Sequence, residues 1–266
     1  MDGGSSIDFN IAVASGGGVF LSFSSQLRLD GGSSLSRNKA YSGGGAYVYK
    51  SSRMTLVDGS RLVANVAKQG GGVALSGATV PGTLRGATSL SLHSGSGASN
   101  NTATFGGFAF LTGKWPMIFG DPLSRSIIEG SASFDDGGAV YVESAAHDIR
   151  ISNLDVRSST AKGRGTAIFV GVGCKNASIS NTLSLNHITL YYGAFVYVSL
   201  ESEVHLADVE STNDRATNNG GIIYVAEAAT LIVSRLSVLR AAVNMGVIFV
   251  RSSVGPLYLR STYEHT

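Results

Sequence analysis

Few side chains in this sequence stand at spacings that support catalysis. The only adjacent aspartates are Asp135-Asp136, which directly precede Gly137-Gly138, and we interpret them as turn residues that close a corner. None of the five histidines stands at metal-ligand spacing from another. The single cysteine, Cys174, has no identifiable base, so we interpret it as a small buried or turn residue. These residues predict no catalytic centre, no metal and no cofactor.

A ligand could instead meet the chain at two segments that break its regularity, near 79–99 and 114–126. The second segment holds the only tryptophan and two of the four prolines. Insertions in repeat proteins project as loops and often form the binding face. An exposed Trp115 beside Lys114 and Asp121 would suit a sugar or a protein. A loop that folds back and buries its tryptophan fits these residues equally well.

Composition excludes several classes of partner. The 266 residues carry a formal charge of +2 with only 14% charged residues, and no basic cluster interleaves with aromatics. We therefore expect no nucleic-acid partner. No apolar run approaches the ~18 residues of a membrane helix, so we expect no membrane insertion. The start of the chain shows no signal peptide.

The elements that would position any site come from an internal repeat. Asn38-Lys39-Ala40 leads to Gly43-Gly44-Gly45, and the pattern returns at Asn65-Val66-Ala67 and Gly70-Gly71-Gly72. We take as reference the residue before the small apolar residue that opens each copy's strand. The reference residues are Gly18, Gly45, Gly72, Phe108, Gly138, Thr166, Gly193, Gly221 and Gly246. Successive reference residues stand 25 to 36 residues apart. Repeats of this length without helical periodicity are typical of the turns of a parallel β-solenoid.

The first strand of each coil is predicted from three columns of this alignment. The residues one and three positions past the reference are apolar, and because alternate strand residues share a face, both columns can point into a common core. The column two positions past would then face outward as an apolar flank available for assembly with another chain. This candidate flank comprises Phe20, Tyr47, Phe110, Ile168, Phe195, Ile223 and Ile248. The two faces could also be exchanged, as in a strand buried on both sides.

Two further strands per coil read as apolar-x-apolar triplets. Examples are Leu27-Arg28-Leu29 for the second strand and Leu154-Asp155-Val156 for the third. Three short strands and three turns per coil predict a triangular prism of about nine coils. At about 4.8 Å per coil, the rod would be some 40 Å long.

Asparagine and glycine recur at the corner before the first strand. Asn10, Asn38, Asn65 and Asn101 suit a stacked ladder whose amides bond the next coil's backbone, and ordinary turn residues are the alternative. Glycine supplies positive φ at little steric cost. The structural ladder is thus predicted from these asparagines together with Gly18, Gly45, Gly72, Gly138, Gly193 and Gly221.

These motifs resemble those of a known family. Leu35-x-x-Asn38-x-Ala40 followed by Gly44-Gly45-Ala46, and Gly137-Gly138-Ala139-Val140, resemble the Phe-x-x-Asn and Gly-Gly-Ala-Ile/Leu/Val motifs of chlamydial polymorphic outer membrane protein passengers. Leucine replaces phenylalanine before the asparagine, and several later coils keep only the spacing. The resemblance implies a right-handed, pectin-lyase-like β-helix, surface display and adhesion.

Enzymes on that fold mostly act on acidic polysaccharides, and the sequence departs from their sites. The polygalacturonase type would need a Gly-His-Gly, which does not occur here. A pectate-lyase site would need several carboxylates on one face to hold calcium, and carboxylates are too sparse to name such a set.

The sequence therefore predicts one all-β domain over 1–266: a single right-handed parallel β-helix of about nine coils with three short strands per coil. Because Met1–Ile7 aligns with Leu29–Leu35, the chain opens inside a repeat, and we expect a segment of a longer extracellular or surface protein. The expected function is non-catalytic display, adhesion or lateral assembly, with a protein partner: itself or a neighbouring solenoid. The alternative is a carbohydrate-active or glycan-binding module that uses the loops of coils three and four.

Overall fold

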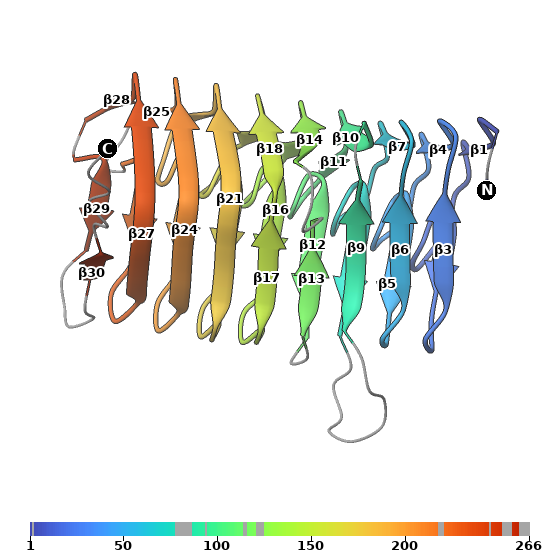
Figure 1. Ribbon diagram of the computed structural model, residues 1–266, viewed down its shortest axis with the longest axis horizontal. Helices are drawn as coiled ribbons and strands as arrows, with labels where there is room; N and C mark the ends of the chain where they lie inside the picture. Colours follow the sequence, from blue (N-terminus) through green and yellow to red (C-terminus); the bar gives the residue numbers. More distant parts are fainter. Residues whose placement is uncertain are drawn as a thin grey trace, which may run out of the picture.

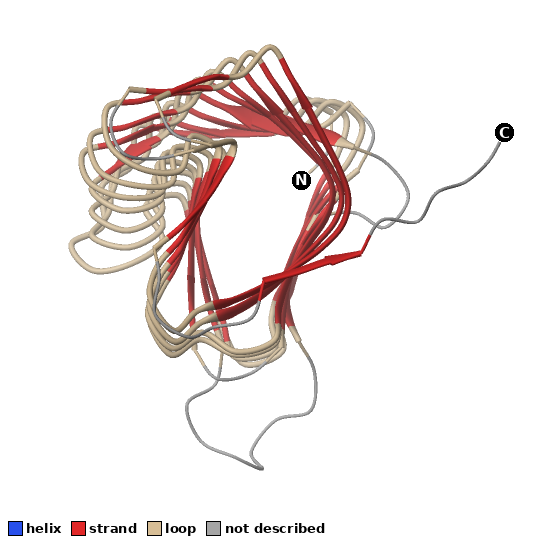
Figure 2. Cartoon of the chain, turned by 90° about the vertical axis from the view of Figure 1, so that its left-hand side faces the viewer, coloured by secondary structure: helices blue, strands red, loops and turns tan. Residues whose placement is uncertain are grey.

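The computed structural model of the protein describes residues 1, 3–77, 87–93, 95–113, 116–120, 125–217, 221–244, 246–251 and 257–260. Within these ranges the chain contains strands and no helix, and every strand pairing is parallel. Successive strands stack side by side along the long axis (Figure 1), and the view along that axis shows a closed cross-section (Figure 2). The predicted parallel β-solenoid is confirmed.

The predicted first strands form a nine-stranded sheet in sequence order. Its strands are β2 (Val19–Leu21), β5 (Ala46–Tyr49), β8 (Val73–Ser76), β12 (Ala109–Thr112), β16 (Val140–Val142), β20 (Ile168–Val170), β23 (Val196–Val198), β26 (Ile223–Val225) and β29 (Ile248–Val250).

The predicted second and third strands join in one fifteen-stranded sheet. Second strands are β3 (Gln26–Leu29), β6 (Arg53–Leu56), β9 (Thr88–Leu92), β13 (Met117–Phe119), β17 (Ile149–Ser152) and β30 (Leu257–Arg260). Third strands are β1 (Ser6–Asp8), β4 (Ser34–Ser36), β7 (Arg61–Val63), β10 (Gly97–Ser99), β14 (Ser126–Glu129) and β18 (Leu154–Arg157). The two strands are continuous in β21 (Ala177–Leu185), β24 (Glu203–Thr212) and β27 (Thr230–Leu239), the long arrows of Figure 1. In these long strands a single residue with positive φ, such as Asp208 (φ 53), bends the chain where earlier coils use a turn such as Asp58-Gly59.

A six-stranded sheet of two-residue strands lies at the Asn-x-Ala corner. Its strands are β11 (Thr102–Ala103), β15 (Ala132–Ser133), β19 (Thr160–Ala161), β22 (Ile188–Thr189), β25 (Arg215–Ala216) and β28 (Ala242–Val243). Single bridges Ile11↔Lys39, Lys39↔Val66 and Val66↔Thr102 continue this stack towards the N-terminus. The alanine of the motif points inward, as at Ala40, Ala103 and Ala161, which are all buried.

Inward side chains of the sheets form one apolar core along the solenoid. Leu29, Leu56, Leu75 and Leu111 are fully buried in it. Neighbouring coils place identical or similar side chains in register, as in Leu29↔Leu56 and Leu35↔Leu62. Burial of such columns is the main favourable contribution to folding.

One glycine column defines the corner before the nine-stranded sheet. Gly43 has φ +64, and a Cβ there would lie 2.0 Å from the carbonyl oxygen of Ala46, so only glycine fits. The same left-handed conformation recurs at Gly16, Gly70, Gly106, Gly137, Gly165 and Gly193. The predicted role of glycine at this corner therefore belongs to the residue two positions before Gly45.

The register of the nine-stranded sheet differs from the sequence alignment in the second half of the chain. Ala109 pairs with Val140 and not with Ala139, and Val140 pairs with Ile168. The reason is that Gly137-Gly138 occupies the places of Gly43-Gly44, so the counterpart of Gly45 is Ala139. A shift of one residue exchanges the inner and outer faces of a strand.

The four asparagines at the corner form a hydrogen-bonded ladder. Oδ1 of Asn65 accepts from the main-chain N of Asn38 at 2.9 Å and from its Nδ2 at 3.2 Å. Oδ1 of Asn101 receives the same two bonds from Asn65, at 3.0 and 3.1 Å. Nδ2 of Asn65 also donates to the carbonyl of Leu35 at 2.9 Å. The amides of Asn38 and Asn65 thus bond the coils on both sides, and the Asn101 amide bonds the coil before it.

The glycines of the predicted ladder occupy three different positions. Gly45 lies against the ladder, since its Cβ would stand 3.0 Å from Nδ2 of Asn65, and Gly18 lies in the same way against Asn38. Gly72 instead makes room for the ring of Phe108. Gly138 and Gly221 pack against the carbonyl of the next coil, and Gly193 is the left-handed corner residue.

Candidate functional site

The outer face of the nine-stranded sheet carries a stack of aromatic rings. From β12 to β29, neighbouring ring centroids lie 4.8 to 5.3 Å apart with the rings close to parallel. The stacked rings belong to Phe110, Tyr141, Phe169, Tyr197, Tyr224 and Phe249. A second stack, Phe20 on Tyr47, lies closer to the N-terminus, and Ala74 separates the two.

This stack corrects the predicted outward flank. Phe20, Tyr47 and Phe110 do lie in the outward column. Ile168, Phe195 and Ile223 are wrong as outward residues, because all three are fully buried in the core. Ile248 also packs against the core. For Ile168 and Ile223 the one-residue shift after Ala109 explains the error, since the outward residue of β20 is Phe169 and that of β26 is Tyr224. Phe195 is displaced by two residues: Gly193 is the left-handed corner residue, so Phe195 takes the place of Gly45, before β23, where its carbonyl accepts from the main-chain N of Ile168.

The chain's own corner covers the middle of the stack. The Arg164 guanidinium lies 5.0 Å from the ring centroids of both Phe169 and Tyr197, a cation–π arrangement. The ring of Tyr192 lies 4.8 Å from that of Tyr224. Phe169, Tyr197 and Tyr224 are buried as a result. The aromatic column is therefore a covered layer, and it does not form the bare apolar flank that the sequence predicts.

A polar cluster beside the stack holds Arg164 in place. Asp136, almost fully buried, accepts from Nη2 of Arg164 at 2.7 Å and from its main-chain N at 2.6 Å. Burial, followed by the neighbouring Asp136 charge, raises the pKa of the adjacent Asp135. Burial and the same charge raise the pKa of Tyr141 to about 12. The aspartate pair thus closes a corner, as predicted, and also anchors an arginine over the rings.

The cluster borders a shallow depression of about 310 Å³. The exposed rings of Phe134 and Tyr191 stand at its margin, and Nζ of Lys162 lies 5.4 Å from the Phe134 ring centroid. Its lining is Phe134, Asp135, Asp136, Lys162, Gly163, Arg164, Tyr191 and Tyr192. Aromatic faces beside a few polar groups are typical of ligand-binding surfaces.

The six-stranded sheet presents an exposed ridge next to this depression, which we call the corner ridge. Its inner column, in seven rungs from the N-terminal end, is Ile11, Lys39, Val66, Thr102, Ala132, Thr160 and Ile188. Its outer column, two residues after each inner residue in the sequence, is Val13, Tyr41, Lys68, Thr104, Phe134, Lys162 and Leu190. The first rung has one residue more before the bridge Ser15↔Ser42 than the second rung has, so Val13 and Ala14 together stand opposite Tyr41. Val13 is 96% exposed and Leu190 61% exposed, so the first and seventh rungs carry exposed apolar groups, and the stack continues beyond the seventh rung with Arg215 and Ala242.

Lysines alternate with rings along the outer column. Nζ of Lys68 lies 5.2 Å from the centroid of Tyr41, one rung earlier. Lys162 has the same relationship to Phe134. A depression of about 460 Å³ lies between the two columns of the first four rungs. The ridge thus combines exposed apolar, aromatic and cationic groups, with no carboxylate in either column.

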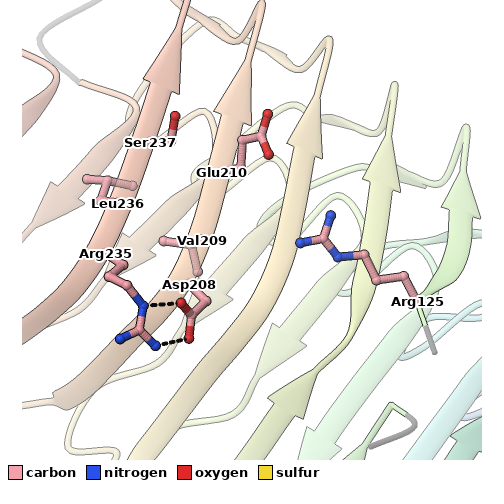
Figure 3. Close-up of a pocket in the computed structure, with 7 residues that line it drawn as sticks. All are labelled: Arg125, Asp208, Val209, Glu210, Arg235, Leu236 and Ser237. Atoms are coloured by element: carbon pink, nitrogen blue, oxygen red, sulfur yellow. Dashed lines mark hydrogen bonds and ion pairs between the residues drawn. The ribbon is translucent and has the colours of Figure 1, made fainter. Parts of the chain in front are cut away.

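A second kind of surface lies on the outer face of the fifteen-stranded sheet (Figure 3). Arg235 pairs with Asp208 on the neighbouring strand, and Nη2 of Arg125 donates to Oδ1 of Asn181 at 2.7 Å. Figure 3 shows the Arg125 guanidinium extending towards these strands, with Val209 between Asp208 and Glu210 and with Leu236 next to Arg235. The arginines of this surface already have partners within the chain, and its remaining charged group is the Glu210 carboxylate.

A buried polar cluster of Ser184, His187, Ser211 and Asp214 was not predicted from the sequence. All four side chains are fully buried, and Asp214 accepts hydrogen bonds from the other three. His187 and Asp214 stand where earlier coils have the ladder asparagines, and the serines replace Leu35 and Leu62 in the core column. The sequence signal for this cluster is the pair of serines, Ser184 and Ser211, in a core column that is apolar in the earlier coils. Because all four side chains are buried, the cluster is closed to any substrate.

The remaining candidate residues from the sequence are Cys174 and the three loop residues Lys114, Trp115 and Asp121. Cys174 is buried, and burial raises its thiol pKa to about 11, which makes it a poor nucleophile. Lys114, Trp115 and Asp121 lie outside the described residues, as do parts of the two predicted loops, whose described residues include β9, β10 and β13. Among the described residues no three His, Cys, Asp or Glu side chains gather into a metal-binding group. No helix in the described part of the chain is long and apolar enough to cross a bilayer.

No protein-family model, curated protein or solved structure matches this chain.

Proposed function

We propose that this chain is a non-catalytic structural segment that assembles laterally with other protein surfaces through the corner ridge. The observation that carries the proposal is the ridge itself, in which exposed apolar, aromatic and cationic residues flank a central rung of two threonines on a hydrogen-bonded stack of strands. Tyrosine and phenylalanine are enriched in protein interfaces, and the buried core of an interface is more apolar than the rest of the protein surface. A contiguous exposed apolar surface marks an interaction site.

The chemistry of the charged and nucleophilic groups supports a structural role. Asp136 is occupied by Arg164, Asp214 is enclosed with His187, and the Cys174 thiol is buried. Each of these groups lies at a corner of the solenoid and stabilises that corner. A rod whose ladder, core column and aromatic stack all repeat along one axis is suited to hold a surface at a fixed spacing.

Glycan binding is the second candidate, and the depression beside Phe134 and Tyr191 favours it. A sugar could lie on either ring while Asp135 or Lys162 bonds its hydroxyl groups. This location differs from the loops of coils three and four that the sequence indicates.

The resemblance to glycine-rich surface repeats supports an extracellular or cell-surface location within this proposal. Adhesion and display are then the roles in which a laterally assembling rod would act.

The test is light scattering coupled to size exclusion over a concentration series. Wild-type chain should show reversible growth in mass with concentration. The double variant Val13→Asp/Leu190→Asp should remain monomeric. Val172→Asp/Leu200→Asp makes the same chemical change at two exposed residues outside the ridge and should assemble like wild type. A wild-type monomer at every concentration would contradict the proposal and direct attention to a glycan screen.

A further inference from the structure

The order of residues along the corner ridge specifies a partner. We propose that the ridge binds a second copy of this chain, antiparallel, about a two-fold axis that passes through the rung of Thr102 and Thr104. This inference rests on the proposed lateral assembly and adds its partner and register. In such an isologous contact each rung faces the rung at the same distance on the other side of the axis.

The outer column is complementary to its own reverse. Thr104, in the fourth rung, faces itself. Lys68, one rung before it, faces Phe134, one rung after it, and Tyr41 faces Lys162 in the same way. The terminal rungs bring Val13 against Leu190, so that two of the most exposed apolar side chains cover each other.

The inner column obeys the same two-fold relationship. Ile11 faces Ile188 at the ends, Val66 faces Ala132 next to the axis, and Thr102 faces itself. The remaining pair is Lys39 with Thr160, which places no two like charges directly opposite each other. Apolar residues thus meet apolar residues in both columns.

The lysines decide between an antiparallel and a parallel pair. Lys68 already lies over Tyr41 of its own chain, and the antiparallel register places Phe134 of the second copy on its other side. Lys162, which lies over its own Phe134, gains Tyr41 of the second copy. Each ammonium would then be held between two rings, an arrangement that strengthens as water is excluded. In a parallel pair each rung would face the same rung of the second copy, with the inner and outer columns exchanged. Lys68 would then face Val66 of the second copy and would contact no second ring.

Asp135 adds charge complementarity to this register. It follows Phe134 directly, so it lies in the rung that faces Lys68 of the second copy. A carboxylate and an ammonium that approach across an interface attract each other and help to fix its register. We therefore expect the association to weaken as salt is raised.

The size of the contact sets its expected strength. Seven rungs at about 4.8 Å make a strip about 30 Å long, and a strip two residues wide falls at the small end of specific interfaces. We expect a reversible dimer whose population depends on concentration.

Cysteine cross-linking tests the register directly. Val13→Cys and Leu190→Cys chains are prepared separately, concentrated alone or mixed, and treated with a short bis-maleimide; wild type controls for the buried Cys174. The mixture should give at least tenfold more cross-linked dimer than either variant alone, because Val13 faces Leu190 and lies about 29 Å from the other Val13. Thr104→Arg, which places like charges on the axis, should abolish the dimer. Thr217→Arg, one rung beyond the seven of the ridge, should leave it intact.

The outcomes separate this inference from the proposed function. Cross-linking of Val13→Cys to itself would show a parallel pair and overturn the antiparallel register. Ridge-dependent assembly by light scattering without the mixed cross-link would overturn the second-copy register and leave lateral assembly standing. Absence of any assembly would contradict both.

Discussion

Asp214 accepts two hydrogen bonds from His187 in the preceding coil, at 2.8 Å from its main-chain N and 3.1 Å from Nδ1, and both side chains are fully buried. Burial by itself raises the Asp214 pKa, but the bonds from His187 and Ser184 outweigh it and hold the pKa below its usual value. The pair stands in the same column as the ladder of Asn38, Asn65 and Asn101, separated from it by Ser131 and Ser159, and uses a carboxylate acceptor where the ladder uses amides.

This pair predicts a loss of stability in acid. Because the Asp214 pKa is lower in the folded chain than the value of about 3.9 in an unfolded chain, the unfolded state binds more protons in that range. The contribution of Asp214 is therefore complete above about pH 4 and lost as pH falls through the folded-state pKa. Urea unfolding of wild type between pH 2.5 and 7 should show this acid loss.

Substitutions at Asp214 isolate its share of that loss. Asp214→Asn keeps an acceptor for the main chain, as the ladder asparagines do, and should lose less stability on acidification than wild type. Asp214→Ala leaves His187 and two serines without their acceptor and should cost about 3 kcal/mol or more. If the unfolding free energy falls equally with acid in wild type and in Asp214→Asn, then other carboxylates control the loss of stability in acid.

The asparagine ladder predicts that the cost of losing an amide depends on its place in the stack. Asn65 is fully buried and bonded to the coils on both sides, so Asn65→Ala should lower the unfolding free energy by about 2–4 kcal/mol, since buried groups lose their partners. Asn10 stands at the exposed end of the ladder and bonds Asn38 on one side. Asn10→Ala should cost less than about 1 kcal/mol. Equal costs in chemical denaturation would argue against a cooperative ladder.

The register of the nine-stranded sheet predicts opposite responses at two phenylalanines. Phe195 is fully buried and its replacement by alanine should cost about 3–5 kcal/mol. Phe20 is 53% exposed on the outer face, and Phe20→Ala should cost less than about 1 kcal/mol. Differential scanning calorimetry of both variants measures this. A mild effect at Phe195 would restore the outward position that the sequence alignment assigns to it.

The sequence predicts the solenoid well because its repeat is strict where the glycines are. Three consecutive glycines at 16–18, 43–45 and 70–72 align the first coils without ambiguity. From Gly137 on, two glycines or one remain, and the corner gains a residue such as Asp135, so either of two registers satisfies the apolar pattern. Only the hydrogen bonds between coils, such as that from the Val140 main-chain N to Ala167 at 2.9 Å, decide between them.

The candidate surface was harder to predict for a related reason. The aromatic column emerges only in the correct register, where Tyr141 stands next to Phe169. The corner ridge joins residues about one repeat apart, and no local motif marks Tyr41 and Lys68 as neighbours. Knowledge of which residues share a rung turns these scattered side chains into one surface.

Small-angle X-ray scattering over a concentration series tests lateral assembly most directly. Side-by-side pairing through the corner ridge predicts that mass and cross-sectional radius rise together while the maximum dimension stays near that of the single rod. The Val13→Asp/Leu190→Asp variant should keep the monomer's cross-section throughout. A maximum dimension that doubles at constant cross-section, or scattering that never departs from the monomer, would contradict assembly through this ridge.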